Sequence, residues 1–113
     1  MNRFLPMLLL LAASAAGAVT EFRGQTPSGA YFVAQVPDGW RAGDRLALIN
    51  HGYDIEPIDQ DPSLGPASLR ERMLARGYAI AASSYSQRGW ALFQTRTDHR
   101  ELVAAFSARF GVP

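Results

Sequence analysis

Two short apolar runs constrain most strongly what this chain can fold into. Leu46–Ile49 and Tyr78–Ala82 lack the alternation of a strand with one wet face, so both are predicted to be strands buried on both faces. Between them, Ala67–Arg76 has a helical pattern, with Pro66 near its start and Gly77 as its stop. A strand, a helix and a second buried strand predict a parallel pair joined by a crossover helix.

Three further elements complete the predicted order. Val19–Gln25 and Tyr31–Val36 are expected to form two strands upstream, and a second helix is expected downstream. That helix begins at Trp90, or at Thr95 if Thr95 and Asp98 form a capping box. The expected fold class is α/β, with about four strands and two helices.

Composition excludes several classes of function. The 113 residues are 48% hydrophobic and 19% charged, with a net charge of +1. Such a chain is expected to be globular, and it lacks the basic cluster that a nucleic-acid partner would require. It has no cysteine, which excludes disulfides, thiolate zinc sites and a cysteine nucleophile.

The N-terminus has the layout of a secretory signal peptide. Arg3 precedes an apolar stretch over residues 4–16, and Ala16-Gly17-Ala18 supplies a cleavage site. We therefore expect a signal peptide over residues 1–18, a mature chain over 19–113, and a secreted or periplasmic protein. The alternative is a membrane anchor, but a spanning helix needs about 20 apolar residues, and this stretch is shorter and contains Pro6. No stable membrane anchor is expected after cleavage.

The chemistry is expected at Asn50-His51-Gly52-Tyr53, directly after a predicted strand. Ligands bind beyond the carboxyl ends of strands in open α/β sheets. A glycine there permits a sharp turn and a close approach, so the next N–H can point at an oxygen that gains negative charge in a transition state. The motif alone equally fits a plain turn in which His51 is hydrogen-bonded locally.

Five segments, in order, carry a resemblance over residues 29–113. They are Val36-Pro37-Asp38-Gly39-Trp40; Asn50-His51-Gly52-Tyr53; Gly77-Tyr78-Ala79-Ile80-Ala81-Ala82-Ser83-Ser84-Tyr85-Ser86; Gly89-Trp90-Ala91; and Phe106 with Phe110-Gly111-Val112-Pro113. In this order and spacing the chain resembles secreted bacterial α/β-hydrolases of the serine esterase or peptidase kind.

The resemblance implies a serine hydrolase that cleaves a small ester or amide, with no cofactor and with esters favoured over peptides. It assigns one oxyanion-hole donor to the N–H of Tyr53 and the turn to Gly52. In the family, a strand follows the FG-x-P ending and leads into G-x-S-x-G, which holds the nucleophile. No G-x-S-x-G occurs in this chain. We therefore expect a truncated sheet that is inactive alone; the alternative is a non-catalytic exported α/β binding domain or a degenerate homologue.

Other serines are poor substitutes for that nucleophile. Ser83, Ser84 and Ser86 lie near the expected rim, but the only later histidine is His99, beside Asp98. Adjacent helical residues do not face each other, so Asp98 is not expected to orient His99. His99 is predicted on the helix surface.

Two residue sets near the expected site have a functional and a structural interpretation. One is an acidic loop that could hold a hard cation but lacks an EF-hand pattern, so solvated carboxylates are favoured. The other is a set of aromatic residues that line a pocket or pack in the core. The loop residues are Asp54, Glu56, Asp59 and Asp61, and the aromatic residues are Tyr85, Trp90 and Phe93.

Overall fold

The structure is a computed structural model that describes residues 17–113, so the prediction of a signal peptide falls almost entirely outside the described residues. In chain order the elements are β1 (Val19–Gln25), β2 (Tyr31–Pro37), β3 (Leu46–Ile49), α1 (Ala67–Ala75), β4 (Ala79–Ser83) and α2 (Gln94–Phe110). The predicted number and order of elements are confirmed within these residues, and the strand bounds agree to within one residue.

The four strands form one sheet in the order β1-β2-β4-β3. β1 pairs antiparallel with β2, and β2 pairs antiparallel with β4, whereas β3 and β4 run parallel. The predicted crossover unit β3-α1-β4 is therefore present. The sheet is mixed rather than parallel throughout, because only the second half of the chain alternates strands and helices.

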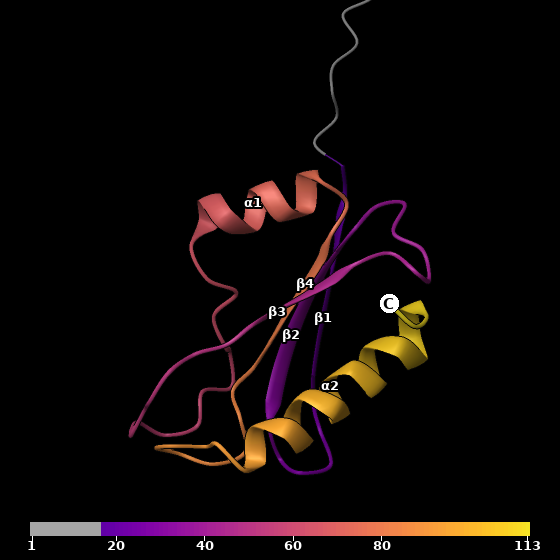
Figure 1. Cartoon of the computed structure of the whole chain (residues 1–113). Helices are drawn as coiled ribbons and strands as arrows, with labels where there is room; N and C mark the ends of the chain where they lie inside the picture. The colour runs from indigo at the N-terminus through magenta and orange to yellow at the C-terminus, as the bar shows by residue number, and fades with distance from the viewer. Residues whose placement is uncertain (1–16) are drawn as a thin grey trace, which may run out of the picture.

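The two helices cover opposite faces of the sheet (Figure 1). Successive residues of a strand point to opposite faces, so β2 contributes Phe32, Ala34 and Val36 to one face and Val33 to the other. The result is a three-layer α/β/α arrangement, which accounts for the lack of alternation in β4.

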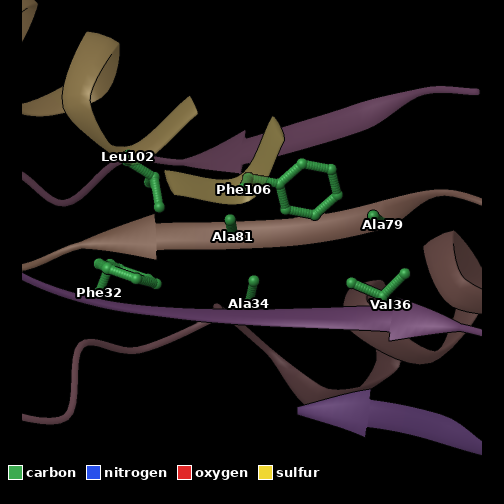
Figure 2. Packing of buried hydrophobic residues seen from close by; sticks show 7 residues of the cluster. All are labelled: Phe32, Ala34, Val36, Ala79, Ala81, Leu102 and Phe106. Carbon is green, nitrogen blue, oxygen red and sulfur yellow. The ribbon is translucent and has the colours of Figure 1, made fainter. Parts of the chain in front are cut away.

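The larger core lies between the sheet and α2. Figure 2 shows Leu102 and Phe106 from α2 directed at small side chains of β2 and β4. Phe106 is fully buried, and its ring meets the Trp40 ring edge-on at 5.0 Å. Alanines at 34, 79 and 81 let the helix approach the sheet closely. Figure 2 labels the buried residues of this cluster: Phe32, Ala34, Val36, Ala79, Ala81, Leu102 and Phe106.

The core on the α1 face is smaller. It contains Val33, Ile80 and Ala82 from the sheet together with Leu64 from the loop before α1, and Leu74 packs against it from the helix. No residue of α1 is fully buried. This helix therefore adds less apolar burial than α2.

Leu46–Ile49 was predicted to be a strand buried on both faces, with one neighbouring strand missing from this truncated sheet. Within residues 17–113, β3 is an edge strand, and all four of its residues are only half-buried. β4, by contrast, lies between β2 and β3 and is buried along its whole length, as predicted. The apolar side chains of β3 do pack on both cores, with Leu46 and Leu48 on the α2 side and Ile49 on the α1 side.

After α2 the chain returns to the amino end of β3. Val112 O accepts a hydrogen bond from Gly43 N at 2.8 Å, three residues before β3 begins. Gly111 makes this approach possible: its φ is +103°, and a Cβ there would lie 2.7 Å from Ala42 Cβ. Residues 111–113 therefore lie beside the start of the unpaired edge.

Candidate functional site

The candidate site lies at the carboxyl ends of β3 and β4. Because these strands are parallel and paired, residues 50–53 and 84–86 leave the sheet at the same edge. The sequence-predicted residues Gly52 and Tyr53 are therefore close to the serine-rich segment that follows β4. This is the edge at which open α/β sheets bind ligands.

The His51 ring bridges the two strand ends. Its Nε2 lies 3.0 Å from Ser84 O and its Nδ1 lies 2.9 Å from Gly52 O. A neutral imidazole carries one N–H, so it donates to only one of these carbonyls at a time. The ring also stacks on Tyr85, with centroids 4.1 Å apart. His51 thus makes the local hydrogen bonds of the structural interpretation and holds the HGY segment against β4.

Tyr85 has an unusual backbone conformation. Its φ is +60°, which makes it the one non-glycine residue with positive φ among residues 17–113. Such a conformation costs about 1–3 kcal/mol and persists only where neighbouring groups impose it. Here Ser83 Oγ accepts a hydrogen bond from Tyr85 N, and Ser84 Oγ donates one to Tyr85 O. The Tyr85 hydroxyl then donates to His51 O at 3.3 Å.

Among residues 17–113, no atom accepts a hydrogen bond from the N–H of Tyr53. Gly52 has no positive φ, and a Cβ placed on it would meet no atom within 4 Å. Gly52 is therefore neither crowded nor in a strained turn. An unpaired N–H is what an oxyanion subsite needs.

A hollow of about 220 Å³ adjoins these residues. One wall is the Tyr53 ring, which lies 5.2 Å from the Trp90 ring between centroids. A backbone bridge fixes this pair, because Gly89 N donates to Asp54 O at 2.6 Å. The hollow is lined by His51, Gly52, Tyr53, Tyr85, Gly89, Trp90, Ala91, Leu92 and Thr95.

The three aromatic residues predicted near the pocket differ in position. Tyr85 and Trp90 line the hollow, whereas Phe93 does not and is 96% exposed. Trp90 is itself 72% exposed, so it lies at the rim. Sequence reasoning did not identify Leu92, which also lines the hollow and carries no motif signal.

A second hollow, of about 170 Å³, lies against His51 and Ser84. Asp54, Glu56 and Asp59 of the acidic loop line it together with Arg88. Within residues 17–113 no three acidic or imidazole side chains are grouped closely enough to hold a metal ion. Two of the loop aspartates accept backbone N–H groups two residues ahead, and Asp61 pairs with Arg23 of β1, so these carboxylates organise the loop.

The serine hydroxyls near the rim make structural hydrogen bonds. Ser83 and Ser84 hold Tyr85 as described, and Ser86 Oγ donates to Asp98 Oδ2 at 3.1 Å. Asp98 is fully buried and also accepts from Ser86 N and from Ser28 Oγ, so it does not orient His99. Among the described residues no serine hydroxyl contacts a histidine ring.

Two predictions for α2 were wrong. Thr95 and Asp98 do not form a capping box, because α2 begins at Gln94 and Thr95 Oγ1 donates back to Ala91 O. His99 is half-buried and not a fully exposed surface residue: its ring meets Tyr85 edge-on at 5.8 Å, and its Nε2 is buried without a partner in the described chain.

Burial and hydrogen bonds shift three pKa values around α2. Burial lowers the pKa of His99, and the nearby Asp98 charge opposes this shift. Burial raises the pKa of the Tyr85 hydroxyl. The Ser28 hydroxyl and N–H lower the pKa of Glu101 by donating to its carboxylate.

No family model matches this sequence, and neither a curated protein nor a solved structure does. The α/β-hydrolase identity therefore stays a prediction from the residues. No helix within residues 17–113 has both the length and the apolar character needed to cross a membrane.

Proposed function

We propose that this chain is the N-terminal portion of an exported serine hydrolase that cleaves a small ester or amide. Its contribution is one oxyanion-hole donor, the N–H of Tyr53, which directly follows Gly52. The observation that carries the proposal is that this N–H is unpaired, at the carboxyl edge of a parallel strand pair, on the rim of a hollow.

The edge of β3 supports a nucleophile encoded further along the gene. Residues 111–113 lie beside the amino end of β3, whose outer edge has no partner strand among the described residues. A strand that continued from there along β3 would run parallel to it and end next to Tyr53. A nucleophile elbow after that strand would place its serine facing the Tyr53 N–H.

The first test is the reading frame downstream of the Pro113 codon. A strand-forming segment followed by G-x-S-x-G supports the proposal, whereas a stop codon at that position supports a non-catalytic exported domain. Residues 19–113 alone are expected to hydrolyse no 4-nitrophenyl ester above background. Serine-dependent turnover by this shorter chain would contradict the proposed position of the nucleophile.

The second test removes the donor atom from the product of the whole reading frame. Tyr53→Pro eliminates the N–H, and loss of one oxyanion donor lowers kcat by about 100- to 1,000-fold. Tyr53→Ala keeps the N–H and controls for loss of the ring. Equal kcat values for the two variants, with circular dichroism unchanged, would show that this N–H does not stabilise the transition state.

A further inference from the structure

Among the described residues, no acidic side chain and no lysine or arginine lines the hollow beside Tyr53. The Tyr53 and Trp90 rings, with Ala91 and Leu92, give it apolar walls. The two nitrogens of His51, its one ionisable imidazole, already face carbonyl oxygens. A charged group placed there would find no oppositely charged side chain within residues 17–113 to compensate for its lost hydration.

The volume of the hollow sets the size of its occupant. An apolar cavity of about 150 Å³ holds one benzene ring. The hollow here measures about 220 Å³, so one ring with a short substituent fills it. Trp90 and Tyr53 are 72% and 55% exposed, and such exposed aromatic rings gain most when an apolar ligand covers them.

The hollow is also held in shape before any ligand arrives. The Gly89 to Asp54 hydrogen bond joins the two loops that carry Trp90 and Tyr53. Gly89 has a φ of +72°, which glycine adopts without strain, so the turn that makes this hydrogen bond is unstrained. A prearranged apolar wall loses little conformational entropy on binding.

We propose that this hollow is the subsite for an uncharged, apolar, ring-sized group of the substrate, next to the carbonyl that the Tyr53 N–H receives. The inference rests on the proposed function and specifies its substrate class: a small ester or amide with an aromatic or compact aliphatic group. Substrates with a carboxylate in this position are disfavoured, because no lysine or arginine of the described chain lines this hollow.

The test is binding of phenyl methyl ketone, an uncharged aryl ketone that esterases do not cleave, to the product of the whole reading frame. Trp90 and Trp40 are the two tryptophans of these 113 residues. Their indole N–H resonances, labelled with ¹⁵N, report on the hollow and on the core respectively, because Trp40 packs on Phe106 and donates to Arg45 O. The Trp90 signal is expected to shift saturably and the Trp40 signal to stay in place.

Substitutions test which side chains form the walls of the hollow beside Tyr53. Leu92→Ala, read on the Trp90 indole, and Trp90→Ala, read on the Tyr53 amide, are each expected to weaken ketone binding by about three- to tenfold. Phe93→Ala is the matched control, since this neighbouring side chain is 96% exposed and outside the hollow. Benzoate, which has the same ring but a negative charge, is expected to bind about tenfold more weakly than the ketone.

The subsite is overturned if the ketone leaves Trp90 unshifted, if Phe93→Ala weakens binding as much as Trp90→Ala, or if benzoate binds as tightly as the ketone. These outcomes are independent of turnover. Ketone binding at Trp90 in a protein without esterase activity would support the hollow and contradict the proposed function. Esterase activity with unchanged KM in Trp90→Ala would contradict the subsite and support the function.

Discussion

Asp98 offers the sharpest test of how the candidate site is held together. It is fully buried, and it accepts hydrogen bonds from Ser86 N at 2.9 Å, Ser86 Oγ at 3.1 Å and Ser28 Oγ at 2.7 Å. These contacts join α2 to the segment after β4 and to the turn between β1 and β2. We therefore expect Asp98→Ala to lower the free energy of unfolding and to release Ser86, which follows the strained Tyr85.

The expected loss of unfolding free energy depends on which donors lose their acceptor when Asp98 is replaced. A hydrogen bond to a charged group contributes about 1.5–3 kcal/mol. The Ser28 hydroxyl has one proton, which it can donate to Glu101 at 2.6 Å in place of Asp98, so its loss is small. The two Ser86 donors lose their acceptor outright, but Ser86 is only half-buried and water reaches part of it. The expected cost of Asp98→Ala is therefore about 2–4 kcal/mol.

The assay is urea unfolding followed by far-UV circular dichroism. Ser86→Ala removes the weaker bond and is expected to cost about 1 kcal/mol, and the double variant should show a coupling energy above about 0.5 kcal/mol. Asp38→Ala, at an exposed turn aspartate, is the control and should change stability by less than about 0.5 kcal/mol. An Asp98→Ala effect as small as that of the control would refute the argument.

Three further predictions concern α2 and its contacts. Burial lowers the pKa of His99 below 6.5, so the unfolded chain binds the proton more readily and stability falls as the pH drops below about 6.5; His99→Gln should flatten the change in Tm between pH 7 and 5. The Ser28 donors lower the pKa of Glu101, so Ser28→Ala should raise that pKa in an NMR titration and weaken the loss of stability below pH 4.5. Phe106→Ala deletes the ring at the centre of the larger core and should cost about 3–5 kcal/mol in urea unfolding.

The sequence was sufficient to predict the elements because their signals are local. Apolar runs, proline and glycine stops and helical spacing place β3, α1 and β4 to within a residue or two. The order of strands is not local information. The apolar residues on both faces of Leu46–Ile49 indicate a core on each face, but they do not identify the strands beside it; within residues 17–113 only β4 is its neighbour.

In the candidate site, too, the sequence predicts what depends on local signals and not what depends on long-range contacts. Strand ends that meet at one edge could be predicted from a parallel pair, and this places residues 50–53 beside 84–86. Contacts between residues far apart in the sequence could not be predicted. Ser28 and Asp98 are 70 residues apart, and no residue near either of them indicates their hydrogen bond. His99 was predicted on the surface because its helix neighbours are polar, and its burial depends on the Tyr85 ring from another segment.

The two edge strands of the sheet differ in polarity, and this difference bears on the proposed function. β1 exposes charged and polar residues, including the ion pair of Arg23 with Glu21, and such edges resist pairing with another strand. β3 carries only Leu46, Ala47, Leu48 and Ile49, and it has no charge or proline to block its outer hydrogen-bonding groups. Because an exposed apolar edge invites association, β3 is suited to a partner strand, and a parallel partner would end beside the unpaired Tyr53 N–H.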